Sequence, residues 1–300
     1  MIKSISNFRK KKLNRILYIL SSSIIFFLCF VMAQQNDLNE GTLHYYDFSG
    51  DNSNTITLPK ELIEISGLAV TVDNRLFAHN DEVGTVYEVD ISKGEIINEF
   101  YLGQKKIKKD FEGIAVANDS FFMVTSAGVI YKFSYSDHEK NVDYIKFKTF
   151  LSAKYNVEGL CYDKATNSLL IACKEYAGRD LAEYKAIFSF DLSSYKLEEE
   201  PRFLINLDSL KNKFNINNFS PTGIEVHPYS GNVFVLSSHE KAIVELSPNG
   251  LLLNAVKLNS KNHRQPEGIA FLSDLSLLIS DEGKREKAKV TFITLSTNHY

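Results

Sequence analysis

The stretch Phe111-Glu112-Gly113-Ile114-Ala115-Val116 decides the fold, because the same short phrase occurs four more times along the chain. Each copy places a glycine in front of a run of apolar or small residues. The other copies are Ile65–Val70, Val157–Tyr162, Pro221–Val226 and Pro266–Phe271. Their glycines lie 46, 46, 64 and 45 residues apart. A period in this range, filled with short apolar strands, is typical of a β-propeller in which each repeat forms one blade.

The first full unit shows how one blade is built. Four short β-like segments, separated by turn residues, follow one another; they are Gly67–Val70, Leu76–His79, Thr85–Asp90 and Glu95–Leu102. Four antiparallel strands in about 40 residues make one propeller blade. The sequence therefore predicts an all-β, five-bladed β-propeller. A six-bladed propeller is the alternative if Gln104–Asp110 or the insertion in the third unit forms a further blade.

The third and last units depart from the regular repeat. The third unit is longer, with an insertion at Tyr176–Lys185 and a stretch of near-helical spacing at Leu204–Phe219. The last unit has too few residues after Ser296 for a fourth strand. The segment Thr42–Phe48 is rich in aromatic and β-branched residues, which favours a strand. We expect this N-terminal strand to complete the last blade and close the ring, because closure removes an exposed sheet edge.

The first 33 residues have the pattern of an export signal. Basic residues precede an uncharged run from Ile16 to Ala33, which ends in small residues, as in a secretory signal peptide. At 18 residues the run also reaches the lower limit for a membrane-spanning helix, so an N-terminal membrane anchor is the alternative. Both interpretations export residues 34–300 to the periplasm or cell envelope, either secreted or attached to the membrane. They divide the chain into this segment, a flexible lead at 34–41 and one propeller domain at 42–300.

The exported part is acidic. It contains 28 of the 34 Lys and Arg residues and all 37 Asp and Glu residues, a net charge of −9. Such a surface disfavours nucleic acid, whose binding depends on basic groups that neutralise phosphates, and it suits cations better. Cys161 and Cys173 fall on adjacent predicted strands. Two buried free thiols are the favoured interpretation, with a disulfide as the alternative.

The residue before each repeated glycine is the strongest candidate for function. This position is polar in all five copies; the residues are Ser66, Glu112, Glu158, Thr222 and Glu267. In a propeller the first strand of each blade lines the central channel, so these side chains should meet at one mouth. Carboxylates held close together repel one another and recruit a cation. Oxygen ligands of this kind suit calcium.

Further carboxylates follow the second strands, at Asp81, Glu175, Asp281 and Glu282. Glu225 stands alone in a column of small residues two positions after the glycines. It is predicted either to face the channel as a ligand or to pair with Arg264. The predicted metal ligands are Glu112, Glu158, Glu267, Asp81, Glu225 and Asp281. The structural alternative is that each glutamate caps backbone amides of a neighbouring blade without a metal.

Several of these features together resemble one known family. A membrane-targeted N-terminus, a Ser-Gly-Leu phrase opening the first blade, Asn80-Asp81 at its second turn and Glu-Gly phrases about 45 residues apart resemble the SdiA-regulated, YjiK-like family. The resemblance covers about residues 58–296. It implies a five-bladed propeller, distantly related to NHL-repeat propellers, with a calcium site and no established activity. It bears on Glu112, Glu158 and Glu267, and extends to Asp81.

The predicted function is that of an exported, membrane-associated calcium-binding propeller, serving as a binding or scaffold module. Its partner would be an extracytoplasmic protein or a small ligand at the channel mouth. The alternative is a metal-dependent hydrolase of the lactonase or phytase-like propeller type, in which the metal polarises a substrate oxygen or activates a water. The sequence has no Gly-x-Ser-x-Gly nucleophile elbow and no histidine pair at metal-ligand spacing, so no catalytic residue is assigned.

Overall fold

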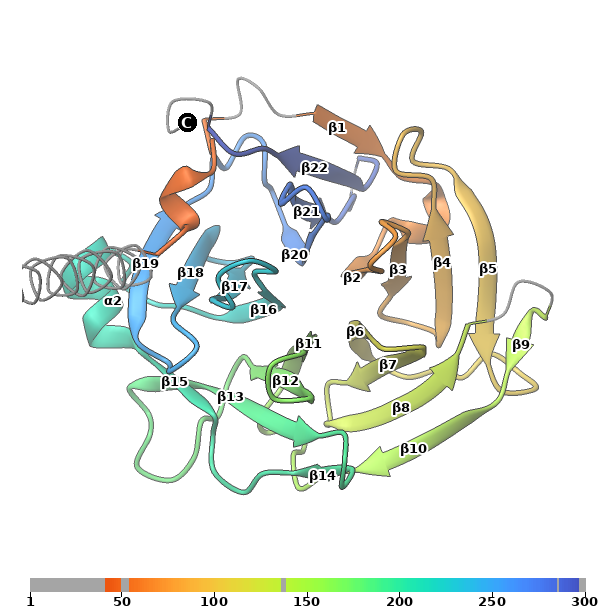
Figure 1. Ribbon diagram of the computed structural model, residues 1–300, viewed down its shortest axis with the longest axis horizontal. Coiled ribbons are helices and arrows are strands. Elements are labelled where there is room, and N and C mark those ends of the chain that lie inside the picture. The colour runs from red at the N-terminus through yellow and green to blue at the C-terminus, as the bar shows by residue number, and fades with distance from the viewer. Residues whose placement is uncertain (1–40, 50–53, 136–138, 285, 297–300) are drawn as a thin grey trace, which may run out of the picture. The chain divides into compact units, whose positions relative to one another are not determined.

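The predicted five-bladed β-propeller is confirmed by the computed structural model, which describes residues 41–49, 54–135, 139–284 and 286–296. Within the compact unit Thr42–Tyr300, five small sheets surround a central axis (Figure 1). The predicted export segment, residues 1–33, and residues 34–40 of the predicted lead lie outside the described residues. Among the described residues, no helix is both long enough and apolar enough to cross a membrane.

Each blade is one sheet whose first strand lies nearest the axis. Blade 1 consists of β2 (Ile65–Val70), β3 (Leu76–Asn80), β4 (Thr85–Val89), β5 (Ile96–Leu102) and the parallel edge strand β9 (Asn141–Val142). Blade 2 consists of β6 (Phe111–Ala117), β7 (Ser120–Thr125), β8 (Val129–Ser134) and β10 (Tyr144–Lys148). Blade 3 consists of β11 (Val157–Asp163), β12 (Ser168–Cys173), β13 (Tyr184–Asp191), β14 (Lys196–Leu197) and β15 (Phe203–Asn206). Blade 4 consists of β16 (Pro221–Val226), β17 (Val233–Ser237), β18 (Ala242–Leu246) and β19 (Leu252–Lys257).

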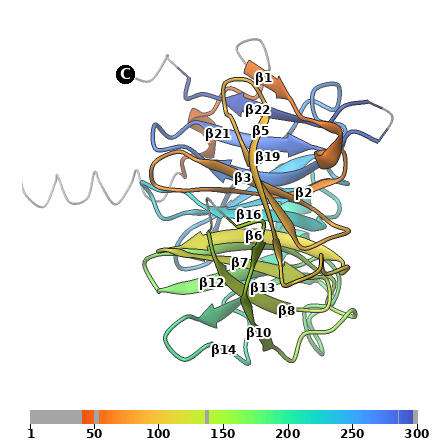
Figure 2. The ribbon, with the colours of Figure 1, turned by 90° about the vertical axis from the view of Figure 1, so that its right-hand side faces the viewer.

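Blade 5 is closed by an N-terminal strand, as predicted, but by a later segment than Thr42–Phe48. Its sheet consists of β20 (Pro266–Phe271), β21 (Leu277–Asp281), β22 (Lys289–Ile293) and β1 (Asn54–Thr57). β1 lies antiparallel beside β22 in both ribbon views (Figures 1 and 2). The predicted strand at Thr42–Phe48 is therefore wrong. That segment forms the short 3-10 helix η1 (Leu43–Tyr45), and only Tyr46 bridges to the last blade, through Leu295.

The segment around η1 is fixed by a buried carboxylate instead of a strand ladder. Glu245 is fully buried on β18 and accepts hydrogen bonds from the Thr42 amide and hydroxyl and from the Leu43 amide. Its carboxylate also accepts from Asn232 Nδ2 at 2.7 Å. Tyr46 packs into the same core and donates to the Leu275 carbonyl at 2.9 Å. Tyr46 and Phe48 of this segment thus pack into the core between blades 4 and 5.

The repeated glycine is required by contacts between neighbouring inner strands. A Cβ atom on Gly113 would lie 2.8 Å from the Leu160 amide nitrogen, and one on Gly223 would lie 2.7 Å from the Glu267 carbonyl oxygen. Both distances are too short for a side chain, because the inner strands approach one another closely at the axis. The inner strands contact their neighbours all the way round, and β20 meets β2 to complete the ring.

The core is divided into five clusters, each lying mainly between two adjacent blades. Alternate residues of each strand face the two neighbouring blades, as the pleat requires. Cys161 and Cys173 are both buried and free, which agrees with the favoured interpretation and not with a disulfide. The near-helical stretch of the third unit is the helix α2 (Leu207–Phe214), capped by Asn206 and packed through Leu210. A second 3-10 helix, η2 (Lys60–Leu62), precedes β2.

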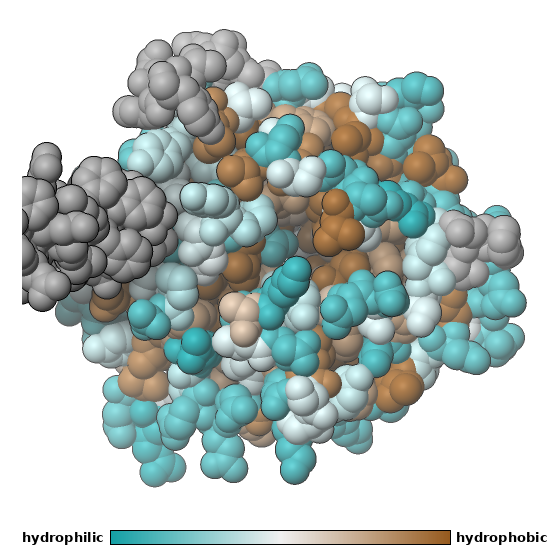
Figure 3. All heavy atoms as spheres, in the orientation of Figure 1, coloured by the Kyte–Doolittle hydropathy of each residue, from teal (hydrophilic) through white to brown (hydrophobic). Residues whose placement is uncertain are grey.

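Hydrophobic residues on the face shown in Figure 3 occur as small groups among hydrophilic ones. The two most exposed large apolar side chains among the described residues, Val72 and Tyr229, lie in turns of blades 1 and 4. Isolated exposed apolar residues are ordinary on a protein surface. These exposed residues therefore do not indicate a binding surface.

Candidate functional site

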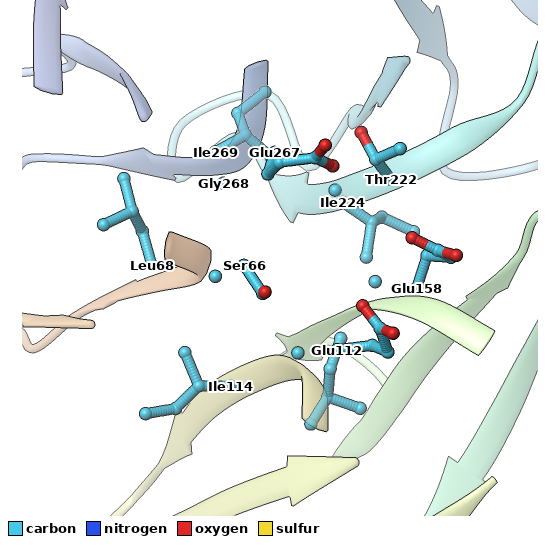
Figure 4. Close-up of a pocket in the computed structure, with 15 residues that line it drawn as sticks. Ser66, Leu68, Glu112, Ile114, Glu158, Thr222, Ile224, Glu267, Gly268 and Ile269 are labelled. Atoms are coloured by element: carbon cyan, nitrogen blue, oxygen red, sulfur yellow. The ribbon is translucent and has the colours of Figure 1, made fainter. Parts of the chain in front are cut away.

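A small cavity lies on the axis, where the five inner strands begin. Its lining comes from the repeated phrase alone: the polar residue, the glycine and the following apolar residue of every blade. Figure 4 shows the carboxylates of Glu112, Glu158 and Glu267 around this space with the hydroxyls of Ser66 and Thr222. We call these five polar residues the channel ring. The cavity volume is about 10 Å³, roughly the space that the centre of one water molecule needs.

The channel ring owes its orientation to five equivalent β-bulges. In each blade the pairing of the first and second strands shifts at the same place, and the residue skipped by the ladder is the one before the glycine. A bulge leaves its extra residue unpaired and re-aims the side chain. Strict alternation along the strand would not direct these five positions to one space. The bulges therefore explain how one phrase supplies both the packing glycine and a channel-facing polar group.

Two further rings of side chains surround the channel ring. Residues that directly follow the second strands form the second-strand ring: Asp81, Ser126, Lys174, Ser238 and Glu282. Residues that directly precede the first strands form the entry ring: Glu64, Asp110, Asn156, Ser220 and Gln265. Backbone hydrogen bonds of 2.9–3.0 Å join the two rings in blades 2, 3 and 5, for example from the Lys174 amide to the Asn156 carbonyl.

Charge is distributed unevenly around these rings. The carboxylates of the two outer rings belong to blades 1, 2 and 5, namely Glu64, Asp81, Asp110 and Glu282. Blades 3 and 4 contribute neutral groups there, with Lys174 as the one basic residue. The mouth therefore has a strongly negative side and a compensated side, which a ring of five identical blades would not have.

Glu112 lies on the negative side. Burial raises the pKa of Glu112 to about 10, and repulsion from Glu158, Asp110 and Asp81 adds to this effect. A carboxyl in such surroundings favours the neutral form or a nearby cation. Asp81 is the counterpart in the second-strand ring: burial and repulsion from Glu64 raise its pKa, and its Oδ1 atom is buried with no hydrogen-bond partner.

Glu158 lies on the compensated side. Its carboxylate is buried and accepts from Lys174 Nζ at 3.1 Å and from Asn156 Nδ2 at 2.8 Å. Burial raises the pKa of Glu158, and the lysine opposes that shift. Glu158 is thus the one carboxylate of the channel ring with a charged partner.

Glu267 is intermediate between these two. Burial, then repulsion from Glu282 and Glu158, raises the pKa of Glu267 to about 8, while a hydrogen bond with Ser238 opposes the shift. Glu282 itself is held by Gln265 Nε2. The Thr222 hydroxyl beside Glu267 has only long contacts to the Pro266 and Leu236 carbonyls, at 3.3 and 3.5 Å. A hydroxyl so weakly engaged remains available to a ligand in the cavity.

Three predicted ligands lie away from the cavity lining: Asp81 in the second-strand ring, Asp281 and Glu225. Asp281 is buried and bonds through Oδ2 to His263 Nδ1 at 2.8 Å and through Oδ1 to the Gln265 amide at 3.1 Å, so it organises the loop before β20. Glu225 lies two positions beyond the glycine of β16 and accepts from the Val226 amide at 2.9 Å. Burial raises the pKa of Glu225 to about 8. It does not pair with Arg264, which contacts Glu286 at 2.5 Å.

The outer rings contain the residues that sequence reasoning missed, chiefly Lys174 and Asp110. For Asp110 a signal was available, because it lies three residues before the repeated glycine, as do the other residues of the entry ring. Near the second-strand ends only acidic residues were considered, namely Asp81, Glu175, Asp281 and Glu282. Asp81 and Asp281 were predicted as ligands, and Lys174 was omitted. Glu175 is exposed, and its neighbour Lys174 takes the ring position.

The donor set fits a hard cation, although it is not assembled around one point. All five channel-ring side chains offer oxygen, the ligand type that calcium and magnesium take. Asp81 adds a buried oxygen without a partner. Within the described part of the chain, however, no three His, Cys, Asp or Glu side chains are already positioned to hold a metal ion. Coordination of one ion would therefore require the channel-ring side chains to move closer together.

Fold and site together define a β-propeller with an acidic channel mouth. The chain belongs to the SdiA-regulated family, whose sequence pattern it matches over residues 54–285. No curated protein shows a significant sequence match to it.

Many solved structures are similar to this chain, and two of them illustrate the shared fold. Myxococcus xanthus glutaminyl cyclase is 12% identical, with a TM-score of 0.54 over 81% of this chain and 94% of that one. A luciferin-regenerating enzyme is 13% identical, with a TM-score of 0.50 over 82% and 96% of the two chains. At such identity the likeness concerns the fold alone.

Proposed function

We propose that this protein binds one divalent cation, calcium, at the channel mouth, and that it works as a binding module and not as an enzyme. The observation that supports the proposal is the channel ring, in which five bulged residues turn three carboxylates and two hydroxyls towards one small cavity. Three carboxylates near one another in a partly buried space are unfavourable without a counter-charge. A bound cation would supply that charge.

The chemistry of the donors favours calcium over transition metals. The channel ring has neither imidazole nor thiolate, which zinc and copper sites prefer. Glu112 and Glu267 would be the principal ligands, because Glu158 already has Lys174 as its partner. Ser66 and Thr222 would add neutral oxygens. Calcium tolerates flexible geometry and a variable ligand number, which suits side chains that must rotate to reach it.

The cavity size is the argument against the hydrolase alternative. A hydrolase needs a metal with open positions that face a pocket large enough for substrate. The cavity at the channel ring has a volume of about 10 Å³, which suits a single ion or water. We therefore favour a binding module, whose partner, an extracytoplasmic protein or a small ligand, would contact the rim formed by the outer rings.

Export to the cell envelope is part of the same proposal. It is supported by the basic and apolar pattern of residues 1–33. Outside the cytoplasm even a weak calcium site would be useful, because extracellular modules bind calcium with Kd values of about 10⁻⁴–10⁻³ M.

The test is the melting temperature of the purified protein in calcium and in chelator. Calcium at about 100 times its Kd should stabilise the fold by about 2.7 kcal/mol, which raises Tm by roughly 5–11 °C for a protein of this size. Glu112→Gln and Glu267→Gln should abolish most of the rise, whereas Glu95→Gln, at an exposed turn position, should keep it.

The absence of a calcium effect in the wild-type protein would contradict the proposal. A rise that survives both substitutions would mean that the ion binds elsewhere. Turnover of lactone or phosphate-ester substrates, lost in those same two variants, would support the hydrolase alternative instead.

A further inference from the structure

Lys174 is the one basic side chain in the three rings at the channel mouth. Its Nζ atom lies 3.1 Å from Glu158 Oε1, and its charge also interacts with Glu267 and Glu112. At the equivalent positions, blades 1 and 5 have carboxylates, Asp81 and Glu282, and blades 2 and 4 have serines. One blade therefore places a fixed positive charge beside a site otherwise built to attract cations.

The position of this lysine is well defined by its surroundings. Its amide donates to the Asn156 carbonyl at 2.9 Å, and its own carbonyl accepts from Lys185 Nζ at 2.5 Å. Asn156 in turn donates to the same Glu158 oxygen that Lys174 contacts. Only about a third of the Lys174 side chain is exposed, at 32%. The ammonium is therefore held at the rim and is not a freely moving surface charge.

Lys174 offsets part of the negative charge at the channel mouth. The three rings contain seven carboxylates, and Lys174 is the one basic residue among them; the carboxylates belong to Glu64, Asp81, Asp110, Glu112, Glu158, Glu267 and Glu282. We infer that Lys174 is a specificity-determining residue, which shifts the preference of the channel mouth from trivalent towards divalent cations. This inference rests on the proposed cation site and adds the feature that sets its preferred charge.

The physical reason is that the repulsion between Lys174 and a bound ion grows with the charge of that ion. Removing the ammonium strengthens the binding of every cation, because a repulsion proportional to the charge of the ion disappears. A trivalent ion gains three times, and a divalent ion twice, the repulsion energy between Lys174 and a single charge; the difference is one such unit. At a separation of several ångströms in a partly solvated site, one such unit corresponds to an affinity change of about tenfold to a hundredfold. A general loss of binding lowers the affinities for trivalent and divalent ions alike. The ratio of the two affinities therefore reports the charge of Lys174 alone.

The experiment measures terbium(III) binding by luminescence and calcium binding by calorimetry on the same full-length protein. Lys174→Met removes the charge and keeps an unbranched stem, while Lys174→Gln keeps a hydrogen-bond donor for Glu158. Both should raise the terbium-to-calcium affinity ratio by about tenfold or more. Lys174→Arg should keep the wild-type ratio. Lys164→Met is the matched control, because Lys164 is exposed in the turn at the opposite end of β11 and β12.

The outcomes separate this inference from the proposed function. Calcium binding with an unchanged ratio in both neutral variants would overturn the role of Lys174 and leave the cation site intact. Binding of neither ion to any form would overturn both. Calcium binding in Lys174→Met but not in the wild type would support Lys174 as the residue that controls cation entry and would refute calcium binding by the natural protein. Thermal melts of each variant show whether it is folded.

Discussion

Glu112→Gln should stabilise the metal-free protein at neutral pH, although it replaces a carboxyl of the channel ring with an amide. The unfolded chain releases the Glu112 proton near the ordinary value of 4.5, whereas burial raises the pKa of Glu112 in the folded protein to about 10. Across that interval the folded state binds more protons than the unfolded state, so stability falls as pH rises. The groups that face Glu112 are Glu158, Asp110 and Asp81, and Lys174 opposes them only in part.

The magnitude follows from proton linkage. One retained proton costs about 1.4 kcal/mol per pH unit, so raising the pH from 5.5 to 7.5 should destabilise the wild-type protein by up to about 3 kcal/mol through Glu112. That corresponds to a fall in Tm of roughly 6–12 °C for a protein of this size. Glutamine cannot release a proton, so the part of the fall in Tm that Glu112 causes should be absent in Glu112→Gln. Glu267 and Glu225 add to the fall in the wild-type protein and in the variant, because burial raises the pKa of each to about 8.

The assay is a series of thermal melts in chelator between pH 5 and 9, for wild type, Glu112→Gln and Glu95→Gln. Both variants exchange one glutamate for glutamine. A difference between their curves of Tm against pH therefore reflects the place of the residue in the fold and not the change in composition. The variant curve should be flatter than the wild-type curve, and the two should meet near pH 5. Parallel curves would refute the reasoning, because they would show that Glu112 titrates alike in the folded and unfolded chains.

Two other features give further predictions. Glu245→Ala should destabilise the fold by about 3–5 kcal/mol, because it leaves the Thr42 and Leu43 amides and Asn232 without their shared acceptor; urea denaturation measures the loss, and an unchanged midpoint would contradict it. Limited proteolysis should then cut near residue 42 in the variant before it cuts elsewhere. Cys161 and Cys173 should resist alkylation in the folded protein, because both are buried and burial raises the pKa of each thiol. The test uses a Cys29→Ser variant, which removes the third cysteine of the chain. Alkylation of this variant before denaturation would contradict the prediction.

The repeat predicted the blades well because strands and turns depend on residues close together in the sequence, and because the close approach of the inner strands recurs at the same glycine in each blade. Asn74 adopts a left-handed φ of 64° in the first turn of blade 1, as a tight turn there requires, and Asn118 and Asn167 do the same in blades 2 and 3. The glycine positions were interpretable for the same reason, since only glycine fits the crowded axis. The number of blades followed directly from these signals.

The closing strand and the outer rings were harder to predict, because both depend on long-range pairing. Aromatic content alone could not distinguish a strand from a segment that packs into a core, so Thr42–Phe48 was predicted as a strand, whereas Asn54–Thr57 forms the ladder with β22. The gathering of the channel ring was predicted because the first strand of each blade lines the channel, but the bulge that produces it depends on pairing with the second strand. The ion-pair partner of Glu158 was missed for a similar reason: Lys174 is distant in sequence from the phrase that it completes.

The anchoring of Thr42 to Glu245 has a mechanical consequence. β1 is a strand of four residues, and its ladder with β22 is what completes blade 5. Tension applied to the chain upstream of Thr42 reaches the hydrogen bonds of Glu245 and the packing of Tyr46 before it reaches that ladder. A buried carboxylate on blade 4 therefore bears the load first, so the chain can be pulled from its N-terminal side before β1 is detached from β22.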